Sequence, residues 1–208
     1  MSVKIQSVVG SQNLALGSEA TPSMARSGGQ LIEDYMPQNF NVSKDGLVFV
    51  ACTAIAGVAH GTSIGTAPPI YVYNPAGSGK ELVILYGQMG YISGTLGAGV
   101  VAWVGSSTST VSSGTAIVPV KVNGFAATGS VASVATGPTL SAAPTLLRPA
   151  WNVSAQLAST AGSAWRVEDK CNGEFILQEG CGIGLQGVAT AGTSPLVVFS
   201  IGWIERTK

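Results

Sequence analysis

The strongest hydrophobic pattern in the chain lies between residues 70 and 104. Its centre, Glu81–Ile92, holds the nearly unbroken apolar run Leu82-Val83-Ile84-Leu85-Tyr86. These β-branched and aromatic residues, bounded by glycines, predict a strand covered on both faces. Ile70–Tyr73 and Val100–Val104 predict shorter strands on either side of it. Because the connections are tight, we expect these three strands to form one antiparallel sheet with a buried centre.

The second strongest pattern is the last one, Leu196–Glu205, in which large apolar residues alternate. One face carries Val197, Phe199, Ile201 and Trp203. Large apolar side chains along one face of a strand must be covered, which requires a facing sheet about 10 Å away. We therefore predict a core that contains Leu82, Ile84, Phe175, Phe199, Ile201 and Trp203.

Weaker patterns fill the rest of the chain. Leu47–Thr53 predicts a strand, and Thr115–Val122 alternates like an edge strand that contains a proline. Asn123-Gly124 predicts a hairpin turn into Phe125, whereas Thr128–Trp151 is rich in small residues and is expected to run over the surface or against a neighbouring subunit.

A second hairpin is predicted near the end of the chain, from Glu174–Leu177 and Ile183–Gln186 joined by a Gln-Glu-Gly turn. The count is then about eight strands with irregular connections. This pattern predicts an all-β fold, a two-sheet antiparallel sandwich of jelly-roll type, over residues 46–208. Residues 1–45 lack sustained periodicity and predict an extended N-terminal arm. Gly29–Met36 within the arm fits a short helix or a strand.

The distribution of charge changes this picture. Charged residues make up 10% of the chain, against roughly a quarter in ordinary domains. Between Gly46 and Trp165 the charged residues are Lys80, Glu81, Lys121 and Arg148. A monomer with so little surface charge is prone to association, so we expect neighbouring copies to cover much of this surface, most simply in a homotrimer.

The formal net charge of zero provides no basic surface for nucleic acid or for anionic lipid. No run of about 18 apolar residues is present, and the first residues lack the apolar core of a secretory signal. We expect neither nucleic acid nor membrane as a partner.

One segment resembles a phosphate-binding P-loop and departs from it in two places. Gly79-Lys80 is followed by Glu81 where a hydroxyl should reach magnesium, and Asn74 stands where the first glycine belongs. A carboxylate at that position would repel phosphates, and a strand follows instead of a helix. We interpret Asn74–Lys80 as a plain turn.

Few residues could support catalysis or bind a metal. His60, the sole histidine, would have to serve as the base of any nucleophilic site, but its small neighbours favour an ordinary surface residue. Glu174 and Glu179 could form a carboxylate pair, although solvated turn residues are the simpler interpretation. We therefore expect no catalytic residue, no cofactor and no metal site.

Cysteines and aromatic residues leave two further alternatives. Cys52, Cys171 and Cys181 have no metal-type spacing and fit small buried or half-buried thiols, although Cys171 and Cys181 could pair across the predicted hairpin. Trp103 and Trp203 lie in strong strands and belong to the core. Trp151, Trp165 and Tyr71 then remain as candidates for a carbohydrate-stacking surface.

Several segments together resemble a group of structural proteins from tailed bacteriophages. The first is Tyr73–Lys80 (YNPAGSGK), followed by Leu82-Val83-Ile84. The second is the end of the chain, from Ala191–Val197 (AGTSPLV) through Trp203–Glu205. The others are Gly46–Ala51 and the glycine-rich Glu179–Leu185. The similarity covers most of the chain beyond the arm.

This resemblance implies a non-enzymatic virion structural protein, assembled in the host cytoplasm. The first expectation is a capsid decoration or cement protein that acts as a homotrimer on the phage shell and contacts other virion proteins, such as the major capsid protein. The alternative is a tail fibre, spike or collar component that binds a host glycan or another virion protein. In either role, residues 1–45 are expected to attach the protein to its assembly.

Overall fold

The fold is described from a computed structural model for residues 39–107, 111–153, 166–188 and 192–208. The chain divides into two compact units, Met1–Phe40 and Asn41–Lys208, and the strands of the described residues belong to the second unit. Gly29–Met36 and most of the predicted arm lie outside the described residues. A short helix, α1 (Phe40–Lys44), occupies the end of the segment that was predicted to be extended.

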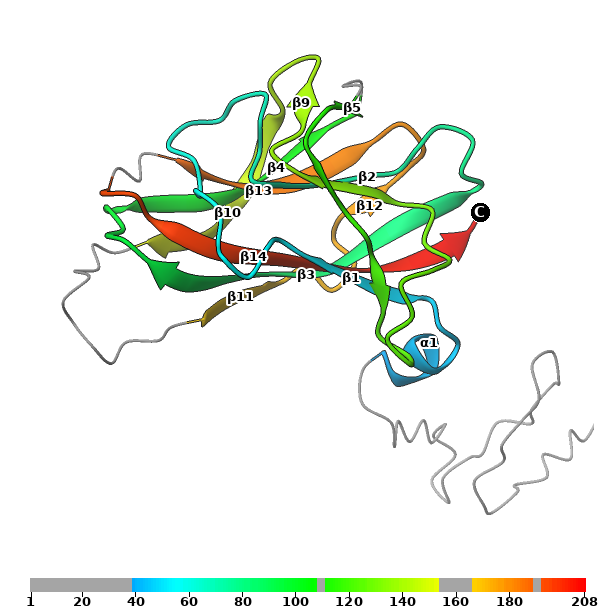
Figure 1. Ribbon diagram of the computed structural model, residues 1–208. Helices are drawn as coiled ribbons and strands as arrows, with labels where there is room; N and C mark the ends of the chain where they lie inside the picture. Colours follow the sequence, from blue (N-terminus) through cyan, green and yellow to red (C-terminus); the bar gives the residue numbers. More distant parts are fainter. Residues whose placement is uncertain (1–38, 108–110, 154–165, 189–191) are drawn as a thin grey trace, which may run out of the picture. The chain divides into compact units, whose positions relative to one another are not determined.

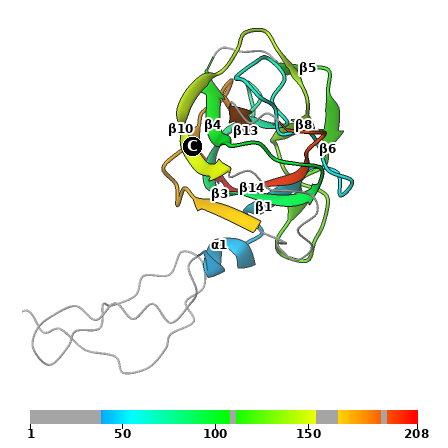
Figure 2. The same cartoon turned by 90° about the vertical axis from the view of Figure 1, so that its left-hand side faces the viewer.

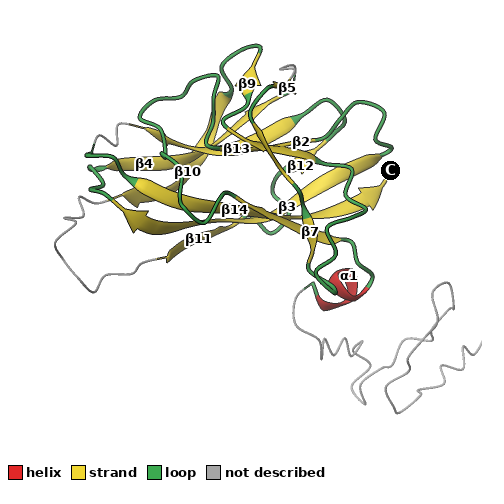
Figure 3. Cartoon of the chain, viewed as in Figure 1, coloured by secondary structure: helices red, strands yellow, loops and turns green. Residues whose placement is uncertain are grey.

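The second unit contains two large antiparallel sheets that pack face to face (Figures 1 and 3). The first sheet has the order β11-β3-β14-β1-β7, and β12 also pairs with β3. Its strands are β11 (Arg166–Lys170), β3 (Lys80–Ser93), β14 (Leu196–Thr207), β1 (Val48–Cys52), β7 (Val120–Lys121) and β12 (Ile176–Leu177).

The second sheet has the order β10-β4-β13-β2-β8-β6, and β5 pairs separately with β9. These strands are β10 (Thr145–Val153), β4 (Gly99–Ser106), β13 (Gly182–Val188), β2 (Ile70–Tyr73), β8 (Ser133–Thr136), β6 (Thr115–Ile117), β5 (Val111–Ser112) and β9 (Thr139–Leu140).

Eight of these strands have the connectivity of a jelly roll. The two sheets contain the orders β1-β14-β3-β11 and β2-β13-β4-β10. In each order, strands from the start of the chain lie beside strands from its end, as two nested Greek keys require. The segment between β4 and β10 adds β6 and β8 to one sheet and β7 to the other. The predicted all-β sandwich of jelly-roll type is therefore confirmed.

The predicted three-stranded sheet is wrong. β3 lies in the first sheet, whereas β2 and β4 lie in the second and are separated by β13. The late hairpin is wrong for the same reason, since β12 pairs with β3 and β13 pairs with β2 and β4. Tight connections in this fold pass between the sheets, so neighbours in sequence face each other across the core.

Three predictions for residues 115–151 are also wrong in whole or in part. The single edge strand Thr115–Val122 is two strands, β6 and β7, because Pro119 lies where the chain crosses between the sheets. The Asn123-Gly124 turn forms, closed by Lys121 N–H donating to Ala126 O at 2.9 Å, but no strand follows Phe125. The segment expected to be a surface excursion contains β8, β9 and most of β10. β8 pairs with β2 and β6, β9 pairs with β5, and β10 pairs with β4.

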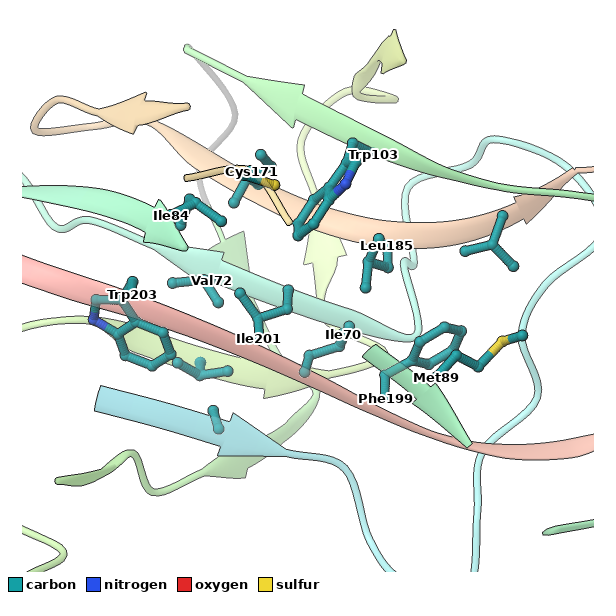
Figure 4. Packing of buried hydrophobic residues seen from close by; sticks show 14 of the residues in the cluster. Ile70, Val72, Ile84, Met89, Trp103, Cys171, Leu185, Phe199, Ile201 and Trp203 are labelled. Atoms are coloured by element: carbon teal, nitrogen blue, oxygen red, sulfur yellow. The ribbon is translucent and has the colours of Figure 1, made fainter. Parts of the chain in front are cut away.

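The core lies between the two sheets and draws on both (Figure 4). Leu82, Ile84, Phe199, Ile201 and Trp203 are fully buried as predicted, whereas Phe175 is half-buried and packs against Trp103 with ring centroids 5.8 Å apart. The Trp103 ring occupies the space above Gly87, where a Cβ atom would come within 2.6 Å of it.

A smaller cluster covers the outer face of the first sheet. Val48, Leu85 and Ile204 are buried there, and Val42 of α1 packs against them. The middle of β3 is thus covered on both faces, as its apolar run predicted. Because this cluster depends on α1, residues from Asn41 onward pack as part of the sandwich.

Candidate functional site

The segment that resembles a P-loop does bind an anion, but that anion is a side chain of the same protein. The backbone N–H groups of Gly77 and Gly79 donate to the two carboxylate oxygens of Glu179, at 2.9 and 3.1 Å. Lys208 Nζ lies 3.3 Å from the same carboxylate. These contacts, led by the Gly77 hydrogen bond, lower the pKa of Glu179. Glu179 therefore has a structural role in holding this turn.

Asn74 fixes the base of the turn. It is fully buried, and its Nδ2 donates to the carbonyl oxygens of Lys80 and Leu177, at 2.8 and 3.0 Å. Its Oδ1 accepts from the Ser78 hydroxyl at 2.7 Å. The asparagine that stands in place of the first P-loop glycine thus holds the turn through its side chain, in agreement with the plain-turn interpretation.

A group of charged side chains joins the two sheets where β10 and β11 meet. Arg148 Nη2 lies 2.8 Å from Asp169 Oδ2, and Arg148 Nε lies 3.1 Å from Glu174 Oε2. The guanidinium also lies over the Phe175 ring, 5.5 Å from its centroid. Burial raises the pKa of the nearby Cys171 thiol to about 11, which leaves it protonated at neutral pH. The thiolate that nucleophilic chemistry requires is therefore disfavoured here.

Glu205 is a buried carboxylate that the sequence did not single out. Its oxygens accept from Ser130 Oγ at 2.6 Å and from the backbone N–H of Val131 at 3.1 Å, and Lys80 Nζ lies 3.1 Å away. Trp203 Nε1 donates to it at 3.3 Å. Because these donors already occupy its oxygens, the Glu205 carboxylate stabilises the packing of β14 and has little hydrogen-bonding capacity left for a substrate.

His60 is buried rather than on the surface, so that prediction is wrong. It is 1% exposed, its carbonyl accepts from Gly187 N–H, and its Nδ1 contacts the carbonyl oxygen of Gly61. The loop packs onto β13 because Gly187 has no side chain, and a Cβ there would lie 2.8 Å from His60 Nδ1. A histidine enclosed in this way is poorly placed to act as a base for an external substrate.

The other sequence candidates do not converge on one site. Glu174 and Glu179 bind different partners, Arg148 and the Gly77–Gly79 turn. Of the candidates for a carbohydrate-stacking surface, Tyr71 is buried and Trp151 is half-buried against the core, whereas Trp165 lies outside the described residues. Cys52, Cys171 and Cys181 are free thiols, so the alternative Cys171–Cys181 pair does not form. Cys171 is buried and Cys181 half-buried as expected, whereas Cys52 is exposed and its predicted burial is wrong.

Within the described ranges, no three His, Cys, Asp or Glu side chains gather as a metal site would require. None of the helices in the described part of the chain has the length and apolar character needed to cross a membrane.

The feature that remains without a structural role is a set of large apolar side chains on the surface. Ile55 is 90% exposed, Phe125 is 81% exposed and Val118 is 62% exposed, and Val122 lies between the last two in sequence. Phe125 also has a φ of +56°, which bulky residues rarely adopt. On the opposite side of the sandwich, Leu146, Leu147 and Ile176 are exposed. The Asn-Gly turn before Phe125 was a signal that could have placed this residue at an exposed tip.

No family model, curated protein or solved structure matches this chain.

Proposed function

We propose that this chain is a non-enzymatic structural protein that works by packing against copies of itself and against a larger shell. The specific role proposed is a decoration protein on a tailed-bacteriophage capsid. The observation that carries the proposal is the exposure of large apolar side chains, Ile55, Phe125 and Val118 above all, on a body with few charges. Such surfaces mark sites of protein association.

Three polar side chains support a structural role. Asn74, Glu179 and Glu205 each use their hydrogen-bonding capacity to hold loops and strands of the same chain. Residues positioned for catalysis would instead converge on a shared space where a substrate atom could lie. In the described residues, Asn74 and Glu179 both hold the Asn74–Lys80 turn and Glu205 binds Lys80 at its end, so their polar atoms are directed at the protein's own groups.

The test is quantitative mass spectrometry of purified phage particles that contain this protein. A shell decoration protein is expected in hundreds of copies per particle. A dozen copies or fewer would favour the alternative role in the tail, spike or collar, and absence from purified particles would contradict a virion role altogether.

A further inference from the structure

The chain contains two Asn-Gly pairs, and the structure places them in different surroundings. Asn123-Gly124 lies in the exposed turn after β7, and Asn172-Gly173 lies in the turn after β11. In such a pair the backbone nitrogen of the glycine can attack the asparagine side chain, because glycine has no Cβ atom to hinder the approach. Exposure does not distinguish the two asparagines, since both are exposed. The difference lies in what holds the attacking nitrogen.

Backbone hydrogen bonds hold the second pair against β3. Asn172 N–H donates to Leu85 O at 3.0 Å, and Gly173 N–H donates to Ile84 O at 2.9 Å. Ile84 is fully buried, so Gly173 is anchored to the interior of the sandwich. Attack by the Gly173 nitrogen requires that this hydrogen bond break and that the turn open first. The fold therefore protects Asn172.

The backbone of the first pair is held less closely. Within the described residues, no backbone carbonyl accepts a hydrogen bond from Gly124 N–H. The space around Gly124 is open, since a Cβ atom built there would meet nothing within 4 Å beyond the adjacent residues. Asn123 is held through its side chain, whose Nδ2 donates to the carbonyl oxygen of Lys44 at 2.6 Å. Attack at Asn123 requires this exposed hydrogen bond to break and leaves the core untouched.

The Asn123 side chain connects its turn to the end of α1. Lys44 is the last residue of α1, and Val42 of the same helix packs on the outer face of the first sheet. Figure 2 shows α1 below that sheet, on the side away from β4 and β13. Loss of the amide places a carboxylate against the Lys44 carbonyl, and a carboxylate has no hydrogen to donate. Because two acceptors repel each other at this distance, the turn then separates from α1.

We propose that Asn123 is a deamidation site whose conversion releases the end of α1 from the turn after β7. The Gly124 nitrogen attacks Asn123 Cγ and forms a cyclic succinimide. The Cγ–Nδ2 bond breaks, and ammonia leaves with the proton from the Gly124 nitrogen. Water then opens the ring at one of its two carbonyl groups, which gives aspartate or isoaspartate. The reaction uses water alone and does not depend on the proposed function.

The first experiment incubates the full chain at mildly alkaline pH, where the attacking nitrogen loses its proton more readily. Peptide mapping by mass spectrometry detects the mass gained from amide to acid and separates isoaspartate from aspartate. Asn123 is expected to convert at least about tenfold faster than Asn172, whose glycine must first break a backbone hydrogen bond. With the chain unfolded in guanidinium chloride, the two pairs should convert at comparable rates, because both backbones are then unrestrained.

Asn123→Asp reproduces one product and tests the consequence for α1. The Asp45 amide donates to Asn41 O at 2.9 Å at the end of this helix, so its hydrogen exchange reports whether the helix end is held. Exchange is expected to be about threefold faster or more than in the unaltered chain, because the turn no longer holds Lys44. Asn172→Asp is the matched control and should leave the Asp45 exchange unchanged.

Three results would overturn the proposal. Conversion of Asn172 as fast as that of Asn123 in the folded chain would mean that the turn after β7 is not the preferred site. A rate difference that persists in guanidinium chloride would mean that the fold does not select the site. Asp45 exchange that is the same in Asn123→Asp and the unaltered chain would show that conversion does not release α1.

Discussion

Trp103 and Asp169 connect the two sheets of the sandwich. The indole Nε1 of Trp103, on β4, donates a 2.6 Å hydrogen bond to Asp169 Oδ2, on β11. The same carboxylate pairs with Arg148, so a fully buried indole and a half-exposed guanidinium share one acceptor group. The polar atom of the largest core residue is thereby satisfied at the edge where β10 and β11 meet.

Asp169→Ala is expected to lower the free energy of unfolding by about 2–4 kcal/mol, because it leaves a buried N–H and a partly buried guanidinium without their acceptor. Urea denaturation measures the loss. Glu168→Ala is the matched control on the same strand, since Glu168 pairs at the surface with Arg166 at 3.6 Å and should contribute less than about 1 kcal/mol. Equal losses in the two variants would contradict the role given to Asp169.

Phe199→Ala is expected to cost roughly 3–5 kcal/mol, because it removes a fully buried ring and leaves a cavity. Phe125→Ala provides a comparison of the same chemical change at an 81% exposed position, where the loss should be within about 0.5 kcal/mol. Chemical denaturation of both variants tests the assigned burial. A small loss for Phe199→Ala would mean that β14 does not face the second sheet as described.

Glu179 provides a prediction about pH. Its pKa is lowered in the folded state, so its contacts stabilise the turn above the pKa of the unfolded chain, and this contribution is lost as the pH falls through the lowered pKa. In Glu179→Gln, hydrogen exchange of the Gly77 and Gly79 amides should be faster at neutral pH and should respond less to acid than in the unaltered chain. Identical pH profiles for the two proteins would contradict the contact.

The sequence predicted the sandwich class and its core because alternation reports directly which face of a strand is buried. Alternation alone predicted that one face of the last strand is buried. The four side chains of that face are fully buried: Val197, Phe199, Ile201 and Trp203. Strand pairing could not be obtained in this way, since a tight connection can turn within a sheet or cross between sheets. β2, β3 and β4 have strong individual patterns, but their partners are set by β13 and β14, far along the chain.

The candidate site illustrates the same limit. His60 was expected on the surface because its neighbours are small, yet small neighbours are what allow the loop to pack closely on β13. The Gly77–Gly79 turn was correctly excluded as a P-loop, but its internal partner, Glu179, is 100 residues or more away along the chain and no local pattern identifies it.

The predicted division between arm and body can be tested with two truncations. A chain that begins at Asn39 keeps Val42, which packs against Val48, Leu85 and Ile204, and should unfold at nearly the temperature of the full chain. A chain that begins at Asp45 loses this contact and should unfold several degrees lower, since about 1 kcal/mol shifts the midpoint by roughly 2–4 °C. Both should fail to bind particles that lack the protein if residues 1–38 are the anchor. Binding as tight as that of the full chain would place the anchor in the sandwich.

The central claim is that this protein works as an assembly of its own copies. The most direct measurement is the mass of the full, unaltered chain in solution, obtained by light scattering at micromolar concentration. We expect a particle of three chains of 20.9 kDa each, which dissociates on dilution through a single transition. A stable monomer across this range would contradict the claim.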